Sequence, residues 1–135
     1  MAEAKRVLAF DFGTRRIGVA VGQQLTGTAS PLKILPAKDG VPDWDVIAQL
    51  IREWQPDTVL VGHPLNMDGS ENEMCLRARK FANRLHGRFG VRVELVDERL
   101  SSFVHRERGQ PLAGKADAID ALAAATICED WLRRL

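Results

Sequence analysis

The chain has 135 residues, of which 45% are hydrophobic and 27% charged, and its formal net charge is +1. This length suffices for a core without stabilising disulfides, so we expect one domain over residues 1–135. The balanced charge is not that of a protein that binds polyanions through overall charge. Cys75 and Cys128 lack zinc-site spacing, and no apolar run reaches membrane-spanning length, so we expect a cytoplasmic protein.

The first half of the chain predicts a strand meander followed by a helix. The connection between the first two apolar runs is short, which favours an antiparallel hairpin. Pro31 interrupts the third run, so we expect that strand to be irregular. The expected elements are strands over residues 6–12, 17–22 and 25–35, and a helix opened by Pro42 and Asp43 and stopped by Pro56.

The second half predicts alternating strands and helices. We expect strands over 58–62 and 91–96, a loop over 63–70, and helices over 71–87, 101–108 (capped by Ser101 or Ser102) and 117–133. A meander followed by such alternation is typical of an α/β domain with a mixed central sheet.

Four acids stand where these elements begin or end. Asp11 closes the first strand, Glu98 follows a later one, and Asp117 and Asp120 open the last helix three residues apart, on one face. Acids in apolar sequence are costly unless they are paired or bind metal. Oxygen ligands suit Mg²⁺ or Mn²⁺, which would support phosphodiester hydrolysis.

Other interpretations of these acids are available. Asp117 fits a helix cap or a partner of the helix dipole, whereas capping explains Asp120 less well. Residues 97–99 fit an exposed strand end with a local ion pair. Asp11 has no comparable structural explanation. The glycines after it match neither a dinucleotide-binding motif nor a Walker A loop.

Four segments, residues 11–20, 61–70, 97–102 and 115–125, resemble the YqgF family, also called RuvX, of the RNase H-like superfamily. The resemblance implies an RNase H-like fold and a metal-dependent nuclease, proposed either to mature the 5′ end of pre-16S ribosomal RNA or to resolve Holliday junctions. It assigns Asp11, Glu98 and Asp120 to the family acids. Asp117 further resembles the paired aspartates of RuvC resolvases and ranks behind Asp120.

One residue departs from the family pattern. His63 stands where Leu or Ile often precedes Pro-Leu-Asn. It is either an extra polar group near the scissile phosphate or a variant of the loop.

Basic residues accompany the acids. Arg15, Arg16, Arg99 and Lys115 could hold phosphate oxygens, and Asn66 could bind phosphate or shape a turn. A stripe of Arg77, Lys80, Arg84 and Arg88 fits either a nucleic-acid backbone or a solvated helix face. The helix-periodic Trp44, Trp54 and Trp131 fit core packing better than base stacking.

The acids and the resemblance together predict a nuclease that requires Mg²⁺ or Mn²⁺. The resemblance alone implies that precursor ribosomal RNA is its preferred substrate. A resolvase of four-way DNA junctions is the nearest alternative, and a stable homodimer rather than a monomer would favour it. A non-catalytic assembly factor that binds nucleic acid is a further alternative. Nothing in the residues themselves selects RNA over DNA.

Overall fold

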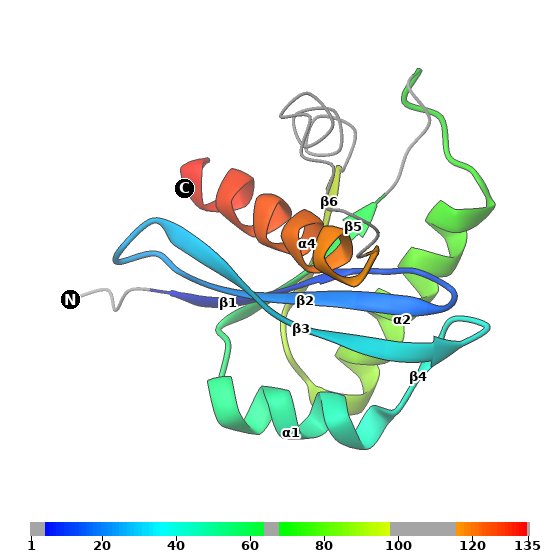
Figure 1. Ribbon diagram of the computed structural model, residues 1–135, viewed down its shortest axis with the longest axis horizontal. Coiled ribbons are helices and arrows are strands. Elements are labelled where there is room, and N and C mark those ends of the chain that lie inside the picture. Colours follow the sequence, from blue (N-terminus) through cyan, green and yellow to red (C-terminus); the bar gives the residue numbers. More distant parts are fainter. Residues whose placement is uncertain (1–4, 64–67, 98–115, 135) are drawn as a thin grey trace.

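The computed structural model describes residues 5–63, 68–97 and 116–134, and the backbone alone within 116–120. Figure 1 shows the elements with their labels. In chain order they are β1 (Arg6–Asp11), β2 (Arg16–Gln23), β3 (Thr28–Lys38), β4 (Val41–Pro42), α1 (Trp44–Trp54), β5 (Thr58–His63), α2 (Glu73–Phe89), β6 (Val93–Asp97) and α4 (Ala116–Arg133).

Across the described residues, the strands form one sheet in the order β4-β3-β2-β1-β5-β6. The first three strands make the expected antiparallel meander, and β1, β5 and β6 run parallel to one another. The prediction of a mixed sheet is thus confirmed. The parallel arrangement brings the ends of β1, β5 and β6 to one edge of the sheet, at Asp11, His63 and Asp97.

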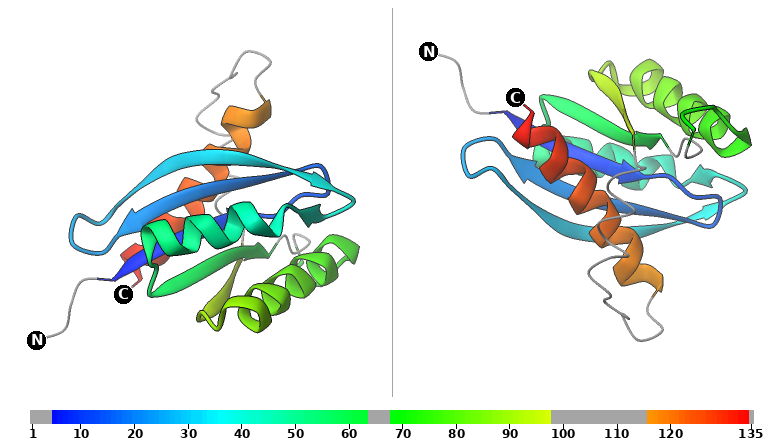
Figure 2. Two further views of the ribbon diagram at one scale, coloured as in Figure 1. Left: turned by 90° about the horizontal axis from the view of Figure 1, so that it is seen from below. Right: turned by 90° about the horizontal axis from the view of Figure 1, so that it is seen from above.

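Helices cover both faces of the sheet (Figure 2). Helices α1 and α2 lie on one face, where Leu8, Phe10 and Phe81 belong to the larger core cluster. Helix α4 crosses the other face, where Ile127 and Cys128 pack with Val7 and Ala9 of β1. Because strand side chains alternate, β1 contributes its even-numbered residues to the first face and its odd-numbered residues to the second.

The third strand begins and ends later than expected. It runs to Lys38 rather than to residue 35, and a two-residue strand, β4, that was not predicted pairs with its end. The irregularity expected from Pro31 is present as a register shift between Val19 and Ala20, directly opposite it. Pro31 has no N–H to donate, and the shift accommodates its place in the ladder.

The helix boundaries follow from their caps. The Asp43 carboxylate accepts a hydrogen bond from the Asp45 N–H at 3.0 Å and starts α1 as predicted. The Asn72 side chain accepts one from the Cys75 N–H at 2.9 Å, and Gly90, at φ 66°, ends α2. These caps set α2 two residues later than the hydrophobic stripe indicated, and they also delay β6.

The tryptophans lie in the core, as predicted. Trp44 stacks on Phe81 with ring centroids 5.7 Å apart, Trp54 packs against the same cluster, and Trp131 is a residue of α4 that packs in the cluster between this helix and the sheet. The expected short helix over 101–108 lies outside the described residues. None of the helices in the described part of the chain is long and apolar enough to cross a membrane.

Candidate metal and nucleic-acid site

Asp11 is the last residue of β1 and is half-buried, opposite Gly18 of β2. Val7 and Ala9, two and four residues earlier, pack against α4. The two-residue period of the strand therefore places Asp11 on the α4 face, at the carboxyl edge of the sheet. An acid that shares a metal ion with the acids at the start of α4 would be expected at this position.

Helix α4 begins at Ala116, so Asp117 and Asp120 both stand in its first turns. Asp117 is four residues before Ala121 and Asp120 four before Ala124, and both alanines are buried against the sheet. Both acidic positions thus belong to the side of the helix that is turned toward the sheet. Since Asp117 is already helical, it is not the N-cap residue that one interpretation suggested, although it stays within reach of the helix dipole.

The loop between β1 and β2 depends on Gly13. A Cβ built on Gly13 would lie 2.4 Å from the carbonyl oxygen of Arg16, because the loop folds tightly back on itself. Only glycine fits at that point. Arg15 in this loop and Arg16 at the start of β2 are exposed and are close in sequence to Asp11.

A turn distant in sequence holds this loop in place. The Thr14 carbonyl accepts a hydrogen bond from the Gly40 N–H at 2.9 Å, and the Arg15 carbonyl accepts one from the Ala37 N–H at 2.8 Å. Asp39 and Gly40 form the turn with φ values of 51° and 81°. The Asp39-Gly40 pair is a turn signal in the sequence, but no local pattern predicts the contact of this turn with the β1–β2 loop.

Four predicted site residues, Glu98, Arg99, Asn66 and Lys115, lie outside the described residues. Strand β6 ends at Asp97, immediately before Glu98. Among the side chains that the structure does describe, no group of three metal-ligating residues occurs. Asp11 is the one member of the proposed ligand set whose side chain is included in that description.

His63 is the last residue of β5 rather than part of a loop, and its register partner is Asp97 of β6. Val59 and Val61 pack on the α1 and α2 side, so the same alternation places His63 on that side. Its Nε2 is buried and has no hydrogen-bond partner within the described part of the chain. Asp11 and His63 therefore lie on opposite faces of the sheet, which argues against joint action on one phosphate.

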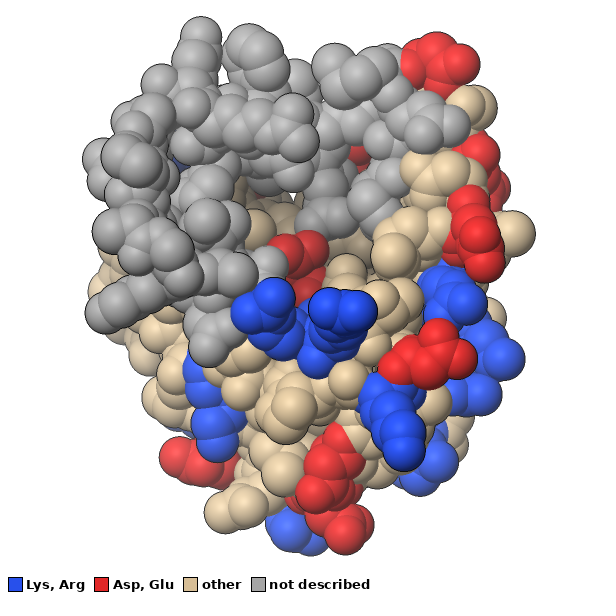
Figure 3. Space-filling model, turned by 45° about the vertical axis from the view of Figure 1, so that its right-hand side comes forward, with Lys and Arg blue, Asp and Glu red and all other residues tan. Residues whose placement is uncertain are grey.

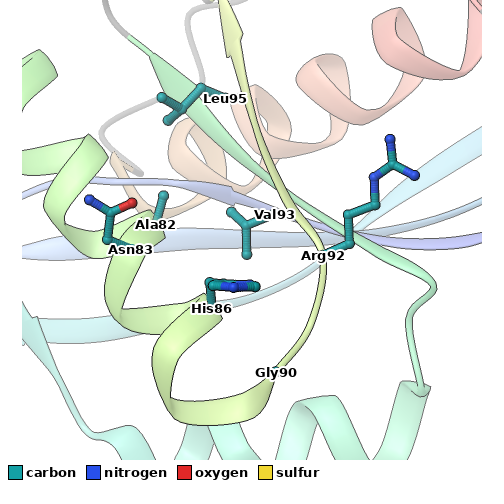
Figure 4. A pocket seen from close by; sticks show the side chains of 7 residues that line it. All are labelled: Ala82, Asn83, His86, Gly90, Arg92, Val93 and Leu95. Atoms are coloured by element: carbon teal, nitrogen blue, oxygen red, sulfur yellow. The ribbon is translucent and has the colours of Figure 1, made fainter.

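A hollow of about 560 Å³ lies between the end of α2 and β6 (Figure 4). The described residues that line it include Asn83, His86, Arg92 and Leu95, and none of the described lining residues is acidic. It extends from the beginning of β6, at the opposite end of the strand from Asp97. The described lining of this hollow therefore supplies no carboxylate ligand for a metal ion, and it does not include Asp11.

The architecture is the RNase H-like fold of the Holliday junction resolvases. A solved structure of Thermus thermophilus RuvC in complex with a Holliday junction substrate superimposes with a TM-score of 0.57 at 17% identity, over 96% of both chains. The yeast mitochondrial resolvase Ydc2 gives the same TM-score at 12% identity, over 96% of this chain and 78% of its own. The predicted fold is confirmed.

Sequence comparison identifies one family among the proteins with this fold. The family model described as "RuvX: Holliday junction resolvase" matches residues 5–134, and the chain belongs to that family. A relative from Marinobacter nauticus is 57% identical, over 96% of this chain and 93% of its own. One from Sodalis glossinidius is 56% identical, over 99% and 98%. Both relatives carry the name "Putative pre-16S rRNA nuclease".

Proposed function

We propose that this protein hydrolyses phosphodiester bonds in a reaction that requires a divalent metal, and that its preferred substrate is the 5′ end of pre-16S ribosomal RNA. The observation that carries the proposal is the position of Asp11, which closes an apolar strand on the face crossed by α4. The names of the relatives from M. nauticus and S. glossinidius support the choice of substrate. That substrate places the activity in the cytoplasm.

The proposed metal ligands are Asp11, Glu98 and Asp120, with Asp117 as a further candidate. The donor set consists of carboxylate oxygens alone, which fits Mg²⁺ or Mn²⁺ rather than zinc. When bound, the cation supplies stabilisation of the negative charge that develops on the phosphate.

The proposed substrate contacts are Arg15, Arg16, Asn66, Arg99 and Lys115. Arg15, in the β1–β2 loop, and Arg16, the first residue of β2, are both exposed, and the backbone of the loop is fixed by Gly13 and by the 37–40 turn. A guanidinium presented from a rigid loop loses less conformational entropy when it binds a phosphate. These residues would hold the backbone while the acids act on the scissile bond.

A second candidate function is resolution of four-way DNA junctions. The family description and the fold likeness to RuvC bound to a junction favour it. Symmetric cutting of a junction requires two active sites, so this function predicts a stable two-fold dimer. A monomer in solution would favour the RNA precursor.

The test is a cleavage assay on two labelled substrates, a pre-16S 5′ fragment and a four-way DNA junction, with Mn²⁺ or EDTA. Wild type is compared with Asp11→Asn and with Glu53→Gln, a matched control at an exposed acid near the end of α1. We expect cleavage that is lost with EDTA and in Asp11→Asn and retained in Glu53→Gln. Binding without cleavage, unchanged in Asp11→Asn, would instead indicate a non-catalytic assembly factor.

A further inference from the structure

A second hollow, of about 370 Å³, lies between α2 and the turn that supports the β1–β2 loop. Three basic side chains of α2 line it together with Phe12, Phe81 and the 39–41 turn; they are Arg77, Lys80 and Arg84. Figure 3 shows basic side chains grouped on this side of the molecule, with acidic ones between them. Which of the cations is available to a ligand depends on their partners.

Arg77 is already engaged. Its guanidinium lies 3.1 Å from the Asp39 carboxylate and 3.6 Å from that of Glu73. Lys80 and Arg84 are exposed, and neither forms an ion pair with any other described residue. The uncompensated positive charge of the hollow therefore belongs to Lys80 and Arg84.

The placement of these charges is unfavourable for the helix by itself. Lys80 and Arg84 are four residues apart, and Arg88 follows after four more. Like charges at this spacing destabilise a helix by a few tenths of a kcal/mol per pair. Elsewhere the chain places an acid four residues before the arginine, as at Glu129–Arg133 and Asp130–Arg134. The run of Lys80, Arg84 and Arg88 has no such compensation among the described residues.

The row of charges is also extended. Arg88 continues it with its guanidinium 4.4 Å from the centre of the Trp44 ring. From Lys80 to Arg88 the helix rises by roughly 12 Å. This length suits two or three successive phosphates of a nucleic-acid strand rather than one small anion.

The basic residues of α2 are connected to the candidate site through an ion pair and a backbone hydrogen bond. Asp39, which pairs with Arg77, belongs to the turn whose Gly40 N–H bonds the Thr14 carbonyl. These two contacts therefore fix the position of Arg15 and Arg16 relative to α2. A nucleic-acid strand that contacts these two arginines would lie next to the basic side chains of α2.

We propose that the backbone of the substrate nucleic acid, beyond the scissile bond, leaves the β1–β2 loop and follows Lys80 and Arg84 along α2. Arg77 serves to fix the Asp39 turn rather than to bind phosphate. The contacts are to charge and carry no base preference, so this surface lengthens the bound segment without selecting its sequence. The inference rests on the proposed function only in taking a nucleic acid as substrate.

The test measures binding of the labelled pre-16S fragment and the junction in EDTA, as a function of salt. The variant is Lys80→Gln/Arg84→Gln, and the control is Arg6→Gln/Arg52→Gln, which removes the same charge at the opposite end of the sheet. We expect the variant to bind about tenfold more weakly. The slope of log K against log salt should fall by about 1.4 for a single strand or 1.8 for a duplex, while the control keeps the wild-type slope.

The two proposals fail separately. If the variant keeps the wild-type slope, or if wild type binds neither probe, the binding surface on α2 is wrong. If the slope falls but Asp11→Asn still cleaves, the surface stands and the proposed catalytic function fails. Thermal unfolding tests whether the double variant is folded. Its melting temperature should equal that of wild type or be slightly higher, because the substitutions remove like-charge pairs.

Discussion

The main chain of Gly22 lies directly against the thiol of Cys128. A Cβ built on Gly22 would be 2.2 Å from the Cys128 Sγ and 3.2 Å from the Leu132 Cδ1. This close approach of α4 to β2 is possible only because position 22 has no side chain. Since α4 carries Asp117 and Asp120, the contact also helps to set where the two acids stand relative to the sheet.

Gly22→Ala should lower the free energy of unfolding by about 1–3 kcal/mol, because the added methyl group overpacks the interface between α4 and β2. Urea denaturation measures the change. The matched control is Gly87→Ala in α2, where an added Cβ meets nothing within 4 Å. That substitution should be neutral or stabilise by up to about 1 kcal/mol.

Cys128→Ala in the Gly22→Ala background should recover part of the lost stability, since it removes the sulfur that the methyl group meets. The double-mutant cycle should therefore give a coupling of about 1 kcal/mol. Strictly additive effects would show that the strain lies elsewhere.

Burial raises the pKa of the Cys128 thiol from an ordinary 9.0 to about 12, and the nearby Glu129 carboxylate adds to the shift. Between pH 9 and 12 the unfolded chain loses this proton while the folded chain keeps it. Stability is therefore fully present below pH 9 and falls as the pH rises through this window. Going from pH 8 to 10.5, wild type should lose about 2 kcal/mol more than Cys128→Ala. Equal losses in the two proteins, measured by urea denaturation, would contradict the raised pKa.

Asn72→Ala should destabilise the protein by about 1 kcal/mol, because the side chain caps the Cys75 N–H at the start of α2. Asn83→Ala provides the control, since Asn83 is exposed in the interior of the same helix. Alanine has the higher helix propensity, so that variant should match wild type or exceed it slightly. Equal melting temperatures for the two variants would show that the cap contributes little.

Local signals predicted much of the fold. Asp43 and Pro56 bounded α1 because capping and the missing proline N–H act within a few residues of the chain. Local signals did not predict where β3 ends. That strand extends to Lys38 because the backbone of residues 37–40 bonds the loop after β1, a contact between segments more than twenty residues apart.

In the candidate site, too, local sequence predicted some features, whereas others depend on tertiary contacts. The apolar strand that Asp11 ends could be recognised from its own sequence, whereas the α4 face on which Asp11 lies follows from the packing of Val7 and Ala9. The position of His63 could not be recognised, because it depends on how far β5 extends and on which of its faces α2 covers. The roles of Glu98 and Asn66 stay predictions, since both residues lie outside the described part of the chain.

Asp117 and Asp120, the two acids at the start of α4, should differ in their contribution to metal-dependent cleavage. We expect Asp120→Asn to reduce metal-dependent cleavage on the order of 100-fold or more, as for loss of a ligand that stabilises charge in the transition state. Asp117→Asn should have a smaller effect, about tenfold, because Asp120 is the acid that matches the family position. Cleavage rates at saturating and at limiting Mn²⁺ distinguish the two roles. A ligand variant should need more metal, whereas loss of a helix-dipole partner should leave the metal dependence unchanged and lower the melting temperature. A larger loss in Asp117→Asn would reverse the assignment and make Asp117 the principal ligand.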